Sequence, residues 1–283
     1  MSTVGSVCLT FDFDGFSSRF VPGGPTGPGA LSRGEFSATA VPRILKLLER
    51  ESIASTWFVP GHTADTFPDL CRRIADAGHE LALHGYLHEP VSMLTPEQER
   101  DVLMRARDAL HRITGSYPVG NRTPGWDFTT ATVDLLLAAG VEYDSSLMAR
   151  DFQPYFARTR DNQATDGPYE FGPETTLVEL GVDWSLCDFP HFEFLFAAGV
   201  LIQGLRRVDD VIQNWIDEVR YMVRDVRDGV CTITLHPEVI GRGHRMLGLE
   251  RFITETRMLG VGFTRQDDIA RQVRAGHAFG VPT

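Results

Sequence analysis

The chain has 283 residues, of which 42% are hydrophobic and 23% charged, and its formal net charge is −11. This is the composition of a globular protein with a sizeable core, and the acidic balance argues against a nucleic-acid partner or a polyanionic substrate. No apolar run approaches the ~18–20 residues that a membrane span requires, so we expect no membrane partner.

The N-terminal residues lack the positively charged region that opens a signal peptide, and their apolar stretch runs directly into Asp12. We interpret this segment as a first strand and expect a cytoplasmic protein. The four cysteines show no short-range pairing pattern. This spacing argues against a disulfide framework and a cysteine metal site, and it fits a reducing compartment.

Apolar, β-branched runs alternate along the chain with amphipathic stretches, which predicts strands separated by helices. Helices are expected around Val41–Leu48, over Val102–Ile113 and, longest, over Leu205–Arg227. The broad apolar face of the last one is compatible with a homo-oligomer. The predicted strands are Ser6–Phe13, Ile53–Val59, Glu80–Leu83, Tyr117–Arg122, Val141–Asp144, Leu177–Val182, Val230–Leu235 and Val261–Thr264.

This alternation implies an α/β fold with a mainly parallel sheet, and seven or eight such units favour a closed barrel over an open sheet. No Gly-x-Gly-x-x-Gly follows the first strand, which weakens a dinucleotide-binding alternative. Polar residues fall at the C-terminal ends of the predicted strands, where barrel enzymes place their chemistry. They are Asp12, Asp14, His84, Arg122, Asp144, Asp183 and His236. We predict one barrel domain over residues 1–283.

Two segments interrupt the alternation of strands and helices. Pro22–Gly34 is rich in glycine and proline, and Phe152–Glu174 is long and polar. At the mouth of a barrel they could act as lids or substrate walls, but variable surface loops would look the same.

Asp12 and Asp14 lie two residues apart in a predicted strand, so both side chains point to one face. Solvated acids at a strand end are the simpler interpretation. Carboxylates facing a barrel interior would need a cation or an arginine beside them, because desolvating them is costly.

His84 and His88 follow the strand Glu80–Leu83, and the nearby Gly85 and Pro90 favour a loop over a helix. A His-x-x-x-His pair also occurs by chance. Together with Asp14 it supplies two imidazoles and a carboxylate, the donor set of a catalytic zinc site that keeps a position open for water.

Five ordered motifs, which span most of the chain, resemble those of the polysaccharide deacetylase family, whose members share the chitooligosaccharide-deacetylase homology domain. These motifs are Phe11–Gly15, His84-Gly85-x-x-His88, Arg122-x-Pro124-Gly125, Trp184…Asp188 and Leu235-His236-Pro237. Tyr143–Met148 and the segment His236–Arg245 resemble the branch that holds cytoplasmic allantoinase-like and imidase-like cyclic-amide hydrolases beside certain peptidoglycan deacetylases. The resemblance implies a distorted TIM-like (β/α)7 barrel and one divalent metal, with zinc favoured over cobalt, nickel or manganese.

Carried over by position, the resemblance implies that Asp14, His84 and His88 are the metal ligands. Asp12 becomes the general base that deprotonates the attacking water, and Arg122 holds Asp12 ionised. The usual first motif has adjacent aspartates, whereas Phe13 separates them here. The spaced form suits the branch of cyclic-amide hydrolases and peptidoglycan deacetylases.

The remaining roles concern the leaving group and the substrate. His236 is expected to protonate the departing nitrogen, and Asp188 to orient His236. Trp184, Pro124 and Trp126 are expected to bind substrate, although a buried tryptophan such as Trp126 also suits the core.

The predicted function is metal-dependent hydrolysis of a non-peptide carbon–nitrogen bond. The substrate is either an N-acetylated sugar or a small cyclic amide or imide. The alternative is a non-catalytic barrel that binds carbohydrate or metal. Degenerate members of the family usually lose a metal ligand or the base, whereas this chain has all three expected ligands and the expected base.

Overall fold

The computed structural model describes residues 4–20, 26–162, 164, 166–193, 195–197, 200–202 and 204–282. Its central strand, β1 (Gly5–Asp12), is buried along its whole length and lies parallel to β11 (Gly229–Leu235) and β2 (Thr56–Val59). A strand buried on both faces is mainly apolar, which explains the hydrophobic residues Val7, Leu9 and Phe11 at the start of the chain.

From β2 the sheet continues through parallel strands and ends on one antiparallel strand, β6 (Tyr155–Arg158). The short strand β12 (Gly262–Phe263) pairs with β1 outside this order. The strands between β2 and β6 are β3 (Glu80–Leu83), β4 (Gly120–Asn121), β5 (Tyr143–Asp144) and β7 (Glu174–Glu179).

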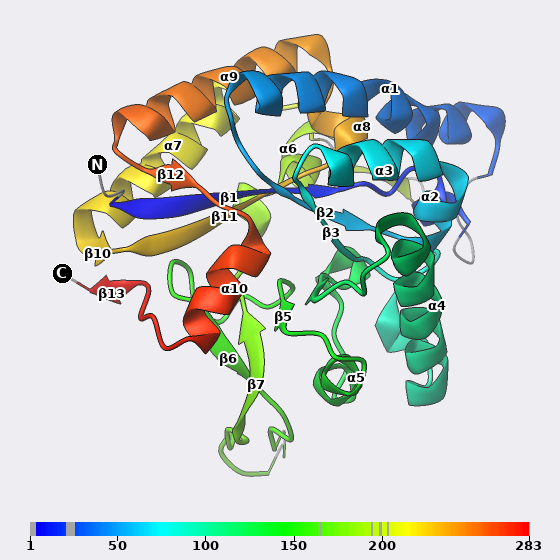
Figure 1. Ribbon diagram of the computed structural model, residues 1–283, viewed down its shortest axis with the longest axis vertical. Helices are drawn as coiled ribbons and strands as arrows, with labels where there is room; N and C mark the ends of the chain where they lie inside the picture. The colour runs from blue at the N-terminus through cyan, green and yellow to red at the C-terminus, as the bar shows by residue number, and fades with distance from the viewer. Residues whose placement is uncertain are drawn as a thin grey trace.

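Helices cover the outside of the curled sheet, with α1 and α9 above β1 in the view of Figure 1 and α4 and α5 beside the later strands. The helix α4 shows why the termini fall where they do. Thr95 and Gln98 form a capping box at its start, and Gly115 ends it with a φ of 74°. The helices are α1 (Pro28–Arg50), α2 (Gly61–Thr66), α3 (Pro68–Asp76), α4 (Pro96–Thr114), α5 (Thr132–Ala138), α6 (Asp188–Phe192), α7 (Val208–Asp225), α8 (Pro237–Ile240), α9 (Gly243–Met258) and α10 (Gln266–Arg274).

The sheet curls without closing through a continuous ladder, because β6 ends it on one side and β11 on the other. The segment that follows β7 bridges the gap, where Cys187 forms an isolated parallel bridge to Thr234 of β11. The expected α/β fold and distorted TIM-like (β/α)7 barrel are confirmed, in the form of a curled half-barrel. The incomplete ladder brings Asp188, the neighbour of Cys187, next to the end of β11.

A polar network closes the N-terminal end of the barrel. The first residue of α10, Gln266, is buried and donates its backbone N–H to Thr56 Oγ1 at 2.9 Å. Glu80 accepts hydrogen bonds from Thr56 Oγ1 (2.7 Å) and Tyr143 Oη (2.8 Å), and burial raises its pKa to about 8. These contacts fill the N-terminal end of the barrel with polar side chains of the described residues.

Each of the eight predicted strands has a counterpart, although the run Tyr117–Arg122 is reduced to β4. The predicted loop Pro22–Gly34 is partly helical, because α1 begins at Pro28, and residues 22–25 lie outside the described part of the chain. The segment Phe152–Glu174 contains β6 and the start of β7. The hydrophobic pattern did not predict two short antiparallel strand pairs. They are β8 (Leu195–Ala197) with β9 (Val200–Ile202), and β10 (Val226–Arg227) with β13 (Val281–Pro282).

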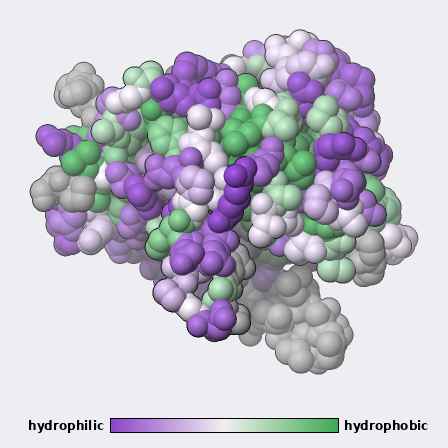
Figure 2. All heavy atoms as spheres, turned by 90° about the horizontal axis from the view of Figure 1, so that it is seen from below, coloured by the Kyte–Doolittle hydropathy of each residue, from purple (hydrophilic) through white to green (hydrophobic). Residues whose placement is uncertain are grey.

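The face that lies below in Figure 1 is mainly polar, with hydrophobic side chains in groups between the polar ones (Figure 2). Among the described residues, no helix combines the length and apolar character needed to cross a membrane. The single domain over residues 1–283 stays a prediction.

Candidate active site

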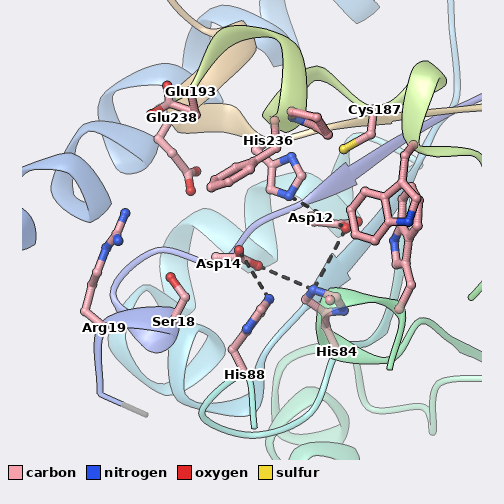
Figure 3. A pocket seen from close by; sticks show the side chains of 15 residues that line it. Asp12, Asp14, Ser18, Arg19, His84, His88, Cys187, Glu193, His236 and Glu238 are labelled. Atoms are coloured by element: carbon pink, nitrogen blue, oxygen red, sulfur yellow. Dashed lines mark ion pairs between the residues drawn. The ribbon is translucent and has the colours of Figure 1, made fainter. Parts of the chain in front are cut away.

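A cavity of about 460 Å³ opens at the C-terminal ends of the strands. Figure 3 shows side chains from β1, from the loop after β3 and from the start of α8 converging on it. The lining residues are Asp12, Asp14, Ser18, Arg19, His84, His88, Gly125, Trp126, Trp184, Cys187, Phe189, Pro190, Glu193, His236 and Glu238.

The two aspartates reach this cavity because β1 ends there. Asp12 is the last residue of the strand and Asp14 follows two positions later, so both face the interior while Phe11 stacks on Trp57 at 4.5 Å on the other side. The chain then turns sharply at Gly15, which has a φ of 56°. The alternation predicted from sequence therefore places both acids in one buried site.

The two histidines come from the loop that follows β3, as the glycine and proline nearby predict. Gly85 (φ 65°) and His88 (φ 61°) both have left-handed backbone conformations. The carboxylate of Glu89 stabilises this turn by accepting hydrogen bonds from the backbone N–H groups of Tyr86 (3.0 Å) and Leu87 (2.8 Å). The loop thereby directs both imidazoles back toward β1.

Asp14, His84 and His88 fit a divalent metal. Asp14 Oδ1 is buried without a hydrogen-bond partner and lies 3.5 Å from His84 Nε2, and Asp14 Oδ2 lies 3.5 Å from His88 Nε2. Such an unsatisfied buried oxygen is costly unless a cation compensates it. His84 Nδ1 lies 2.7 Å from the carbonyl oxygen of Arg122, a contact that fixes the orientation of the ring and leaves Nε2 directed at Asp14.

The protonation states also suit a metal site. Burial lowers the pKa of His84 and takes that of His88 to about 4, so both imidazoles are neutral at pH 7. Metal ligands must be deprotonated, and neutral imidazoles meet that condition without a further cost. Burial raises the pKa of Asp14, and a bound cation would oppose that effect.

Asp12 is held by Arg122, whose side chain is fully buried behind it and does not line the cavity. Arg122 Nη1 donates to Asp12 Oδ1 at 2.7 Å, and Nη2 donates to Ser145 Oγ at 2.9 Å. Burial alone would raise the pKa of Asp12, but the charge and the hydrogen bond of the Arg122 guanidinium bring it below its usual value. Asp12 is therefore an ionised, oriented carboxylate that is not needed to complete the metal site.

His236 stands at the end of β11 opposite these ligands, and its Nε2 lies 3.9 Å from Asp12 Oδ2. Asp188 accepts from His236 twice, from the backbone N–H (2.9 Å) and at Nδ1 (2.8 Å). Burial alone would lower the pKa of His236, but the buried carboxylate of Asp188 raises it well above the usual value. The pair presents a protonated Nε2 to the cavity. Cys187 lies within ligand distance of the same two residues, but their hydrogen bonds already satisfy them.

Two tryptophans form one wall of the cavity. The rings of Trp126 and Trp184 lie 3.9 Å apart between centroids, and the side chain of Trp184 is 45% exposed. Pro124 does not line the cavity; it packs behind the loop, where a Cβ on Gly85 would meet its Cγ at 3.0 Å.

Two acids predicted at strand ends lie elsewhere. Asp144 is buried and accepts from Asn121 Nδ2 at 2.6 Å, while Asp183 is exposed and caps the turn at Ser185. Neither lines the cavity.

Sequence reasoning assigned no role to four polar residues that line the cavity: Ser18, Arg19, Glu193 and Glu238. Glu238 follows His236 by two positions, and that spacing was the available signal for it. Ser18 and Arg19 belong to the short 3-10 turn η1 (Ser17–Arg19), whose direction depends on Gly15 and is not visible in a hydrophobic pattern.

Known proteins are similar to this chain over most of its length. The family model described as polysaccharide deacetylase matches residues 3–143. A peptidoglycan deacetylase of Helicobacter pylori is 37% identical over 242 residues, which cover 82% of this chain and 82% of that protein. A peptidoglycan deacetylase-like protein of Gibberella zeae is 29% identical over 295 residues, and the match covers 94% of this chain and 85% of that protein.

Solved structures extend the similarity to the whole fold. A polysaccharide deacetylase candidate from Mycobacterium smegmatis superposes with a TM-score of 0.83 and 33% identity, covering 100% of this chain and 94% of its own. The Puue allantoinase shares the fold: it superposes with a TM-score of 0.76 and 24% identity, and the match covers 96% of this chain and 90% of that chain. The class is thus a hydrolase built on a curled, barrel-like sheet. The chain belongs to the polysaccharide deacetylase family.

Proposed function

We propose that the chain is a divalent-metal-dependent hydrolase of non-peptide amide bonds. One observation carries the proposal: the buried carboxylate of Asp14, whose Oδ1 has no hydrogen-bond partner, lies 3.5 Å from each of two neutral imidazoles, beside an ionised Asp12 that is held by Arg122. A structural metal site does not require a second buried carboxylate next to its ligands. An enzyme needs that carboxylate as a base.

When bound by Asp14, His84 and His88, the metal would polarise the amide oxygen and lower the pKa of water toward ~7. Asp12 accepts the proton of the attacking water, whose oxygen forms the new bond to the amide carbon. His236 donates a proton from Nε2 to the nitrogen as the carbon–nitrogen bond breaks, so that an amine leaves and a carboxylic acid remains. Arg122 and Asp188 hold the base and the acid in their ionised forms.

The favoured substrate is an N-acetylated amino sugar, because the relative that is 37% identical is named a peptidoglycan deacetylase. A small cyclic amide or imide is the second candidate. A cavity of about 460 Å³ with a tryptophan wall suits a single ring of either kind. A cytoplasmic location and self-association stay predictions of the sequence.

A substrate panel tests the function. Metal-free protein is reloaded with zinc, cobalt, nickel or manganese and assayed on N-acetylglucosamine oligomers, dihydrouracil, succinimide and allantoin. We expect metal-dependent release of acetate from the oligomers. Hydrolysis of the ring amides alone would discard the deacetylase version. The absence of both bound metal and activity would favour the non-catalytic barrel.

Asp188→Asn tests the role assigned to His236. Because Asp188 raises the pKa of His236, its removal should lower that pKa and move the high-pH limb of the kcat profile to lower pH. Loss of the charge should also reduce kcat about 10- to 100-fold, with metal content unchanged. The measurement is kcat against pH for both proteins. A lower rate with an unshifted limb would mean that Asp188 has a structural role only.

A further inference from the structure

One end of the cavity is polar, and the proposed chemistry leaves it unused. Ser18 and Arg19 come from η1, directly after the turn at Gly15, and Glu238 comes from α8. Figure 3 shows Arg19 and Glu238 on the same side of Asp14, with both side chains in the lining of the cavity. This end therefore lies next to the reacting centre without being part of it.

Arg19 is the unusual member of this group. Among the residues that the structure describes, its guanidinium has neither an ion pair nor a hydrogen bond, and its Nε is buried without a partner. Two neighbouring arginines already use terminal nitrogens of their guanidinium groups on protein partners. Arg33 pairs with Glu193, and Arg245 donates to the carbonyl oxygens of Val239 (2.9 Å) and Phe192 (3.1 Å). Arg19 is thus the cation in this group that is left for a ligand.

Glu238 lies at the same end of the cavity. Its side chain is 7% exposed, and its Oε2 has no hydrogen-bond partner in the described part of the chain. This end of the cavity therefore offers a second unsatisfied polar group beside Arg19, to which a hydroxyl or amide group of a ligand can donate a hydrogen bond.

We propose that Arg19 binds a carboxylate carried by the substrate at this end of the cavity, so that the enzyme prefers an acidic amide over its uncharged analogue. The inference rests on the proposed function and adds a specificity determinant to it. A guanidinium recognises a carboxylate through two parallel hydrogen bonds, and a partly desolvated site strengthens them. The chain as a whole carries a net charge of −11, so an acidic substrate would be repelled without such a local cation.

Matched probe pairs test the preference. Dihydroorotate is dihydrouracil with an added carboxylate, and N-acetylmuramic acid is N-acetylglucosamine with an added lactyl carboxylate. Binding is measured by calorimetry on zinc-loaded Asp12→Asn protein, in which turnover is slow, with and without Arg19→Met. The matched control is Arg100→Met, because Arg100 lies exposed on α4 and pairs with Asp101.

We expect the acidic member of at least one pair to bind about 10- to 100-fold more tightly than its uncharged partner. Arg19→Met should abolish that ratio and Arg100→Met should preserve it. Whichever pair shows the ratio identifies the source of the carboxylate. Equal binding within both pairs, a ratio that survives Arg19→Met, or no binding of either acidic probe overturns the inference.

Hydrolysis by the wild-type protein separates this inference from the proposed function. If the protein hydrolyses uncharged substrates and Arg19→Met changes neither binding nor turnover, the proposed function holds and the role of Arg19 in binding a carboxylate is disproved. If an acidic probe binds through Arg19 but no amide is hydrolysed with any metal, the carboxylate site holds and the proposed function is disproved.

Discussion

Replacement of Asp12 by Asn is expected to lower kcat about 10²- to 10⁴-fold while the protein stays folded and keeps its metal. Asn retains an oxygen that can accept the hydrogen bond of Arg122, now 2.7 Å from Asp12 Oδ1, so the geometry is preserved. It has no basic carboxylate and therefore cannot take the proton of the attacking water. The metal should remain because the carboxylate that lies beside both imidazoles belongs to Asp14.

The measurements are kcat on the best substrate of the panel, metal content and circular dichroism. Asp69→Asn is the matched control, because Asp69 is exposed on α3 and far from the cavity lining. Activity within tenfold of wild type would remove Asp12 from the role of base. Unfolding or loss of the metal would instead assign Asp12 a structural role. The physical reason would be that the buried charge of Arg122 has lost its partner.

Replacement of His88 by Ala is expected to abolish measurable activity and to weaken metal binding by at least about 100-fold. His88 is chosen because its side chain is 21% exposed, whereas that of His84 is 1% exposed and its removal would leave a cavity in the core. The zinc-induced rise in the melting temperature of metal-free protein should also disappear, because a ligand stabilises only the state that binds it.

Metal content by mass spectrometry and thermal unfolding with and without zinc check this result. His277→Ala is the control, because His277 is exposed and pairs with Asp228 away from the cavity. A variant that binds zinc normally would disprove the assignment of His88 as a ligand. A His84→Gln variant that loses activity yet stays folded would support the catalytic site over a structural metal, whereas unfolding would support the opposite.

The strand pattern and the spacing of a few polar residues predicted much of this site. Period-two alternation in β1 requires Asp12 and Asp14 to share a face, and the parallel sheet requires strand ends from distant parts of the chain to meet. Asp12, His84 and His236 meet for that reason alone, and their positions in the structure agree. The same rule also named Asp144 and Asp183, which lie outside the cavity. A strand end specifies an edge of the sheet and does not specify whether a side chain points into the barrel.

Local periodicity and ordered motifs were enough to predict the class of fold, the family and the edge of the sheet where the polar residues gather. Which polar groups are satisfied by the protein became visible only in the folded chain. Arg122 and Asp188 are satisfied by partners from distant segments, while Asp14 Oδ1, Arg19 Nε and Glu238 Oε2 are buried without one. Desolvation and pairing are properties of packed neighbours, so no local pattern could separate the residues that build the site from those that await a ligand.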